Sequence, residues 1–224
     1  MKILTFDTSL NKTYLTYGED EKILENREIT STDEKYHSVS LVPEIIDIFK
    51  KYDIKFQDID VIGINEGPGS FTGIRICTVI ARVAAQQADI KVVPVPSLEI
   101  LSRINKTDKK SLVLLDARKH KSYAAIYGKN GEEIKTPDIV VYEEAAELCK
   151  SDDFEIITDS SMKKILSENG INAIDYEAED YPLGEYLYRA TLEKLSSDND
   201  YFWAKAKPLY IQPPSITMPK KAGN

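Results

Sequence analysis

The sequence predicts a two-lobed α/β fold made of two similar halves, each with the element order β-β-β-α-β-α. The prediction depends on an internal repeat. The segment 3–7 is a short apolar run that ends in Asp7, and the segment 112–116 is a similar run that ends in Asp116. The residue pairs that follow at the same spacing are Lys12 and Lys121, Thr13 and Ser122, and Tyr14 and Tyr123. An apolar run, a Tyr-containing run and a Gly-marked turn therefore occur twice, as a duplicated unit predicts.

The first half contains the longer predicted helices. After three strands, a helix is expected over about residues 33–52, because apolar residues recur there at a spacing of three or four. Its apolar positions are Leu41, Ile45, Ile48, Phe49 and Tyr52. A strand over 61–65 and a helix over 73–88 complete this half.

The second half has shorter helices and forms a truncated lobe. Its expected elements after the three strands are a helix over 143–150, a strand over 155–159 and a helix over 162–168, followed by an amphipathic helix over 183–195. We therefore expect an N-terminal lobe over 1–105, a smaller lobe over 106–212 and a flexible, polar tail over 213–224.

Composition restricts the function classes. The chain of 224 residues has 42% hydrophobic and 29% charged residues, as in globular proteins, and a net charge of −8. It lacks an apolar run of the roughly 20 residues that span a bilayer, and its N-terminus resembles a first strand more than a signal peptide, so we expect a cytoplasmic protein with no membrane contact. The acidic balance disfavours independent nucleic-acid binding. Cys77 and Cys149 have no zinc-type spacing and are expected to be buried.

The most specific local pattern is the glycine-rich segment 66–75, which follows an apolar strand and opens a helix. Glycines and backbone N–H groups at a helix N-terminus can form an anion-binding concavity. The segment is not a Walker A loop, because Ile74 and Arg75 follow its last Gly, and a tight structural turn is the alternative interpretation. The residues of this candidate vestigial anion or nucleotide loop are Asp7, Thr8, Ser9, Gly67, Gly69, Ser70, Thr72 and Gly73.

Several segments resemble one family. The sequence GPGSFTGIR at 67–75, MKILTFDTS at 1–9 and the pair His37-Ser38 are similar to the TsaB (YeaZ) family, as are the segments 95–98, 116–118 and 208–211. The resemblance covers residues 1 to about 212, and Lys121 and Gln212 depart from the family pattern. The duplicated unit resembles the actin, sugar-kinase and Hsp70 superfamily, in which a nucleotide lies between the lobes. The resemblance therefore implies an actin-like fold.

The resemblance also implies a function. TsaB-like proteins are non-catalytic subunits that pair with a TsaD-type catalytic paralogue and a TsaE-type ATPase, and they also form homodimers. Together the subunits transfer a threonylcarbamoyl group to adenosine 37 of ANN-decoding tRNAs. For this chain the resemblance implies no cofactor of its own and tRNA contact only within the complex.

The residues at the positions where relatives bind a metal or a phosphate indicate that this chain is not catalytic. The paralogue holds its metal with two His at i and i+4, but here Leu41 stands four residues after His37, so we expect no metal site. Arg118 follows Asp116-Ala117, where related ATPases have Gly. We therefore assign no catalytic residue. The alternatives are an independent actin-superfamily ATP-dependent phosphotransferase and a metal-dependent, glycoprotease-like peptidase.

Two predicted helices are apolar on more than one side. Such helices are buried either in a core or in an interface. We expect the helices of the first half to meet a partner. The predicted interface residues are His37, Leu41, Ile45, Ile76, Ile80 and Val83.

Overall fold

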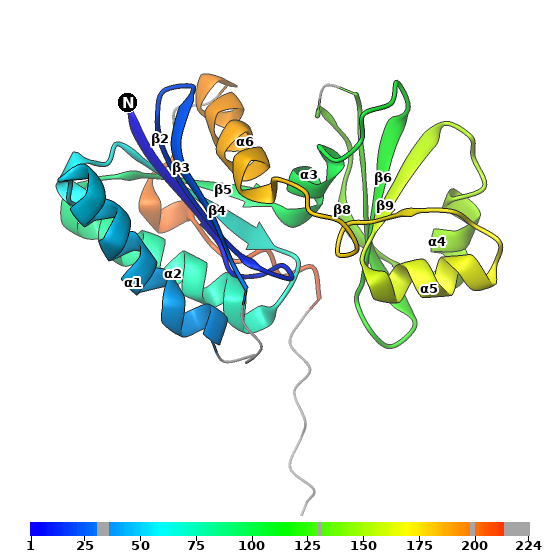
Figure 1. The fold of residues 1–224 in the computed structure, drawn as a ribbon. Coiled ribbons are helices and arrows are strands. Elements are labelled where there is room, and N and C mark those ends of the chain that lie inside the picture. Colours follow the sequence, from blue (N-terminus) through cyan, green and yellow to red (C-terminus); the bar gives the residue numbers. More distant parts are fainter. Residues whose placement is uncertain (31–35, 130, 198–199, 213–224) are drawn as a thin grey trace, which may run out of the picture.

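In the computed structural model, the chain folds into two lobes that lie side by side, each built on a five-stranded mixed sheet (Figure 1). The structure describes residues 1–30, 36–129, 131–197 and 200–212, with only the backbone of 36–39. The tail expected over 213–224 and the predicted start of the first helix near Asp33 lie outside the described residues. The two-lobed, actin-like α/β fold predicted from the sequence is confirmed.

The sheet of the first lobe has the strand order β3-β2-β1-β4-β5. Strand β1 pairs antiparallel with β2 and parallel with β4, so the hairpins lie on one side of β1 and the crossover strands on the other. Helices α1 (Tyr36–Tyr52) and α2 (Phe71–Ala88) pack on one face. The strands are β1 (Lys2–Asp7), β2 (Thr13–Glu19), β3 (Lys22–Ile29), β4 (Val61–Gly67) and β5 (Lys91–Pro96).

The sheet of the second lobe repeats this topology, with the order β10-β9-β6-β7-β8 and the same antiparallel and parallel pairings around β6. The duplication predicted from the sequence is therefore confirmed. Helices α4 (Tyr142–Leu148) and α5 (Ser160–Glu168) cover its outer face and are shorter than α1 and α2. The strands are β6 (Lys110–Asp116), β7 (Lys121–Tyr127), β8 (Glu133–Val141), β9 (Phe154–Thr158) and β10 (Ile174–Asp175).

Each half contains a further strand and helix beyond the predicted β-β-β-α-β-α unit. The first half adds β5 and α3 (Ser97–Ser102), and the second adds β10 and α6 (Leu183–Ser197). Helix α6 packs on the sheet of the first lobe, where it contacts all five strands, while α3 contacts α6 and strands β6 and β7 of the second lobe. The expected boundary between the lobes at residue 105 follows the sequence repeat. In the structure, however, residues 183–197, which come after that boundary in the chain, pack on the sheet of the first lobe.

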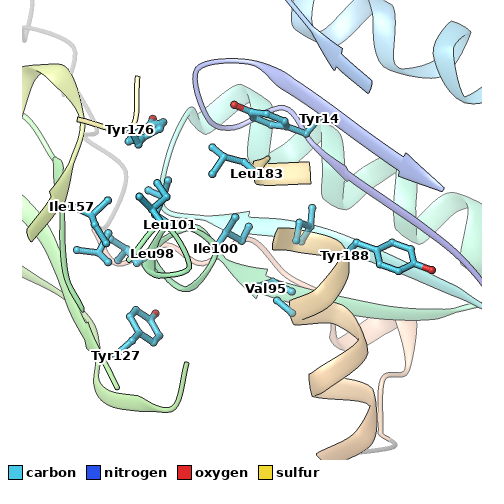
Figure 2. Close-up of a cluster of buried hydrophobic side chains, with 14 of the residues drawn as sticks. Tyr14, Val95, Leu98, Ile100, Leu101, Tyr127, Ile157, Tyr176, Leu183 and Tyr188 are labelled. Carbon is cyan, nitrogen blue, oxygen red and sulfur yellow. The ribbon is translucent and has the colours of Figure 1, made fainter. Parts of the chain in front are cut away.

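A shared apolar core joins the two lobes (Figure 2). Side chains from both sheets meet α3 and α6 there, and the fully buried ones include Val95, Leu98, Val113 and Ile157. Burial of one such side chain contributes about 1.5–3 kcal/mol relative to exposure. The two lobes therefore share one continuous apolar core at this junction.

The strand registers correct one detail of the predicted repeat. Asp7 pairs with Tyr14 across the first hairpin, whereas Asp116 pairs with Ser122 across the second. The second turn is therefore one residue shorter, and the structural counterpart of Tyr14 is Ser122. The sequence match of Tyr14 with Tyr123 is out of register, which matters because a shift by one residue moves a side chain to the other face of a strand.

Candidate functional site: the inter-lobe cleft and the outer face of α1 and α2

The glycine-rich loop packs directly on the turn that follows β1. The Ser70 N–H donates to the carbonyl of Ser9 at 2.8 Å, and the Thr8 hydroxyl donates to the carbonyl of Gly73 at 2.8 Å. A Cβ atom at Gly69 would lie 2.6 Å from the Ser9 carbonyl oxygen, and one at Gly73 would lie 2.0 Å from that of Thr8. These two glycines therefore permit close backbone packing between β1 and the start of α2.

Asp7 is buried at the centre of this arrangement. Its carboxylate accepts hydrogen bonds from the N–H and hydroxyl of Ser9, both at 2.6 Å, and from the side-chain amide of Asn65 at 2.9 Å. Burial raises the pKa of Asp7, and the hydrogen bonds from Ser9 and Asn65 oppose that rise. These hydrogen bonds show that Asp7 holds the turn after β1.

Three of the loop N–H groups that could hold an anion have protein acceptors. The Gly67 N–H donates to Asn65 Oδ1 at 2.8 Å, and the Gly73 N–H donates to Ser70 Oγ at 3.3 Å. With the Ser70 N–H bonded to Ser9, these groups are occupied within the chain. The structure thus brings together the eight residues of the candidate loop, from Asp7–Ser9 and from the segment 67–73, but as a packed turn. Anion binding there stays a prediction.

The corresponding turn of the second lobe has an unusual backbone. Arg118, Lys119 and His120 have positive φ angles of 61°, 53° and 59°, a conformation that glycine adopts most easily. The turn is held because Asp116 Oδ1 accepts from the Arg118 N–H at 2.8 Å and the Ala117 N–H donates to the Lys121 carbonyl at 2.9 Å. Asp116 also accepts from the Tyr142 hydroxyl at 2.8 Å, which orients its carboxylate toward α4.

A cavity of about 330 Å³ lies between the glycine loop and this second turn. Its third wall is the chain segment 209–212. The residues that carry its chemistry are Gly69, Phe71, Arg118, Lys119, Tyr123 and Tyr210. Within the described part of the chain, its lining includes two cationic side chains, aromatic rings and no carboxylate.

The segment 206–212 forms a strap across the start of α2. The Leu209 N–H donates to the Glu66 carbonyl at 2.8 Å, and Arg75 Nε donates to the Tyr210 hydroxyl at 2.8 Å. The Arg75 guanidinium lies 3.8 Å from the centroid of the Phe71 ring. Sequence reasoning matched 208–211 to a family pattern but missed this contact, because no local pattern links residues so far apart.

Beside the strap, Glu66 lies half-buried near the junction of the lobes. Burial raises the pKa of Glu66 to about 7; Glu99 adds to the rise and Lys194 opposes it. Glu99 itself is paired with Lys194, whose Nζ lies 2.9 Å from Glu99 Oε2. The carboxyl group of Glu66 therefore changes charge near neutral pH.

The outer face of α1 and α2 exposes apolar side chains. Val79 and Val83 on α2 are 59% and 56% exposed, and Val42 and Ile46 on α1 are 45% and 46% exposed. Of the residues predicted for an interface, Val83 is therefore exposed, and Ile76 and Ile80 are half-buried. A cavity lined by Phe71, Ile76, Val79 and Ile80 lies on this face.

Two of the predicted interface residues belong to the core instead. Leu41 and Ile45 are 0% and 1% exposed and pack among the buried residues under the first sheet. The prediction for this pair is wrong, because a helix that is apolar on two sides does not reveal which side faces the core. The neighbours Val42 and Ile46 occupy the outer side. The side chain of His37 lies outside the described residues.

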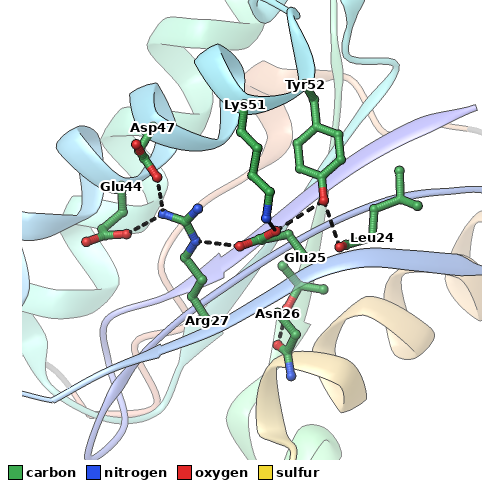
Figure 3. A network of polar contacts seen from close by, with 9 residues as sticks. Leu24, Glu25, Asn26, Arg27, Glu44, Asp47, Lys51 and Tyr52 are labelled. Carbon is green, nitrogen blue, oxygen red and sulfur yellow. Dashed lines mark hydrogen bonds and ion pairs between the residues drawn. The ribbon is translucent and has the colours of Figure 1, made fainter.

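A polar network fixes α1 against the edge strand β3 (Figure 3). Arg27 lies 2.7 Å from Glu44, 2.8 Å from Asp47 and 3.0 Å from Glu25. Lys51 completes it by pairing with Glu25, and these cations hold the pKa of Glu25 below its usual range. The network orients α1 and thereby the outward side chains Val42 and Ile46.

The described residues contain two free thiols but no cluster of metal-binding side chains. They contain no group of three or more His, Cys, Asp or Glu side chains placed to hold a metal ion. Cys77 and Cys149 are free and buried, as the sequence predicts. Among the described helices, none has the length and apolar character needed to cross a membrane.

Known proteins resemble this chain in sequence and in structure. Residues 22–178 match the family described as TsaD: tRNA N6-adenosine threonylcarbamoyltransferase. The tRNA threonylcarbamoyladenosine biosynthesis protein TsaB of Bacillus subtilis is 29% identical over 176 residues, which cover 75% of this chain and 76% of that protein. TsaB of Escherichia coli is 28% identical over 62% of this chain and 64% of its own length. YeaZ from Pseudomonas aeruginosa superposes with a TM-score of 0.75 at 20% identity, over 93% of this chain and 99% of that one.

Proposed function

The chain belongs to the TsaB (YeaZ) family, within the wider TsaD family of tRNA N6-adenosine threonylcarbamoyltransferases, and we propose that it is the non-catalytic partner subunit in threonylcarbamoyladenosine biosynthesis. A role in that pathway agrees with the relatives named TsaB. The proposed partners are a TsaD-type catalytic paralogue and a TsaE-type ATPase, with tRNA bound only in the assembly. The proposed location is the cytoplasm.

The observation that carries the partner role is the exposed apolar stripe on α2. Val79 and Val83 are each more than half exposed, although apolar side chains in a helix of a stable lobe are usually turned inward. Val42 and Ile46 extend the surface on α1, which the Arg27 network holds in place. Two such helices can meet two helices of a partner, with apolar side chains at the centre of the contact. A homodimer through the same face is the competing assembly.

The cleft supports the absence of catalysis by this chain. A phosphate held by the glycine loop needs free backbone N–H groups and space beside the glycines. Here the N–H groups of Gly67, Ser70 and Gly73 have acceptors within the chain. Gly69 and Gly73 pack against the backbone of Ser9 and Thr8. We therefore propose no catalytic residue and no resident cofactor.

Reconstitution tests this proposal. The TsaD-type and TsaE-type proteins of the same organism would be incubated with tRNA and the threonylcarbamoyl donor, with and without this chain, and the modified nucleoside would be measured by mass spectrometry. We expect modification to require the chain and the isolated chain to hydrolyse no ATP. Rapid ATP turnover by the isolated chain would favour the phosphotransferase, and chelator-sensitive cleavage of a peptide would favour the peptidase.

A further inference from the structure

The mouth of the inter-lobe cleft carries a group of cationic and aromatic side chains that the partner role does not use. We call it the cleft surface and define it by Phe71, Arg75, Arg118, Lys119, Tyr123 and Tyr210. Phe71 and Tyr210 are 46% and 44% exposed, and all three cationic side chains are exposed. Residues from both lobes and from the strap therefore converge on one surface.

Charge distinguishes this surface from the rest of the molecule. The chain has 37 acidic and 29 basic residues, and Arg27, Arg103 and Arg189 pair with carboxylates. Within the described residues, neither Arg75 nor Arg118 forms an ion pair with a carboxylate, and no carboxylate lines the cavity between the lobes. Exposed arginines without ion pairs, beside a cavity without carboxylates, fit a polyanionic partner.

The aromatic residues indicate which kind of polyanion would bind to the cleft surface. The Arg75 guanidinium packs on Phe71, at 3.8 Å from the ring centroid, and donates to the Tyr210 hydroxyl. The rings of Phe71 and Tyr210 lie 5.5 Å apart and leave exposed area on which a flat base could stack. Exposed rings interleaved with cations are the pattern of surfaces that bind single-stranded nucleic acid, where bases stack and phosphates meet Arg and Lys.

The backbone presents two of the cations in a fixed position. Arg118 and Lys119 occupy left-handed conformations that are unfavourable for residues other than glycine. Hydrogen bonds from the Arg118 N–H to Asp116 and from the Ala117 N–H to Lys121 maintain the turn. Both side chains line the cavity opposite the glycine loop.

We propose that the cleft surface binds an unpaired segment of RNA, with its phosphates at Arg118 and Lys119 and a base against Phe71 and Tyr210. The choice of RNA over other polyanions rests on the proposed function, in which tRNA is the substrate of the assembly. In that assembly the surface would hold part of the tRNA while the catalytic subunit acts on it.

The test removes charge from the second turn, away from α1 and α2. The double variant Arg118→Gln, Lys119→Gln is compared with Lys163→Gln, Lys164→Gln, which removes the same charge from α5 on the outer side of the second lobe. Fluorescence anisotropy with labelled tRNA is measured at several salt concentrations, for the chain alone and for its complex with the TsaD-type paralogue. Circular dichroism confirms that both variants are folded.

We expect the Arg118 and Lys119 variant to bind tRNA about tenfold more weakly and with a salt slope smaller by about 1 to 2, while the α5 variant keeps wild-type affinity. Equal affinity and slope in the two variants would overturn the proposal. Competition by free ATP at low millimolar concentration would assign the surface to a mononucleotide and would also overturn it. Failure of the wild-type chain to form the complex would count against the proposed function, whereas an intact complex that binds tRNA equally well in both variants would count against the cleft surface alone.

Discussion

The side-chain amide of Asn65, at the end of β4, donates a 2.9 Å hydrogen bond to the buried carboxylate of Asp7 at the end of β1. The other end of the same amide accepts from the Gly67 N–H at 2.8 Å and from the Ser97 hydroxyl at 2.7 Å. One buried side chain thus joins the first strand, the glycine loop and α3. The turn that resembles a phosphate site is held together by contacts within the chain.

Replacing this amide with a carboxylate should destabilise the fold. In Asn65→Asp, two buried carboxyl groups would face each other at hydrogen-bond distance, and one of them would have to remain protonated. We expect a loss of about 3 kcal/mol or more in the free energy of unfolding. The loss should be larger at pH 8 than at pH 5. The carboxyl group introduced at position 65 has a raised pKa in the folded protein, so the free energy of unfolding decreases as the pH rises. Urea denaturation at both pH values measures it.

The matched control is Asn169→Asp, at the exposed C-terminal end of α5. This variant adds the same charge at a solvated position and should change stability by less than about 1 kcal/mol. Equal effects of the two substitutions would show that Asn65 does not have the structural role assigned to it.

The close approach of the glycine loop to the β1 turn gives a second prediction. A methyl group at Gly73 would lie 2.0 Å from the Thr8 carbonyl oxygen, so Gly73→Ala must displace backbone. We expect a loss of about 1–3 kcal/mol in unfolding free energy, as for other overpacked sites. The neighbouring exposed residue provides the control, since Thr72→Ala should leave thermal stability nearly unchanged. A Gly73→Ala protein as stable as the control would contradict the packed turn.

Glu66 should make stability depend on pH near neutrality. Its folded pKa is raised to about 7 from an ordinary value of 4.5, so the folded state binds the proton more tightly than the unfolded state. The stability contributed by the protonated carboxyl is complete below the unfolded pKa and is lost as the pH rises through about 7. The change from pH 5 to pH 8 should be up to about 3 kcal/mol.

The variant Glu66→Gln isolates this effect, because its neutral amide does not titrate. Buried Asp7 and half-buried Asp159 also have raised pKa values, so the difference between wild type and variant is the relevant quantity. We expect that difference to favour the variant increasingly from pH 5 to pH 8, as measured by urea denaturation. Parallel pH profiles would exclude the assigned role of Glu66.

The sequence predicted the regular parts of this fold because they have local periodicity. The long helices α1 and α2 and the repeated hairpins all follow from apolar spacing and turn residues. Strand β5 and helix α3 were missed as elements, because Pro94 and Pro96 interrupt the strand pattern and α3 spans only six residues. A proline in an apolar run argues against a strand unless it lies at a sheet edge, and β5 is an edge strand.

Contacts between distant segments were beyond sequence reasoning. The packing of α6 on the first sheet and the hydrogen bond from Arg75 to Tyr210 depend on how the halves assemble. The two apolar sides of α1 were visible in the sequence, but the choice between Leu41 and Val42 as the core residue depends on the position of the sheet beneath the helix. The eight residues of the candidate loop were grouped from motif and repeat and lie together in the structure, whereas the packing that occupies the N–H groups of Gly67, Ser70 and Gly73 was not foreseeable.

The most direct test of the partner role is co-purification of the chain with the TsaD-type paralogue of its organism, using charged variants of two exposed surfaces. Val79→Glu, Val83→Glu alters the outer face of α2, and Ile134→Glu, Val141→Glu alters exposed apolar residues on β8. All four side chains are at least 44% exposed, so both variants should fold. We predict that wild type and the β8 variant form the complex and that the α2 variant elutes alone. A complex retained by the α2 variant, with wild-type affinity, would contradict the proposed interface.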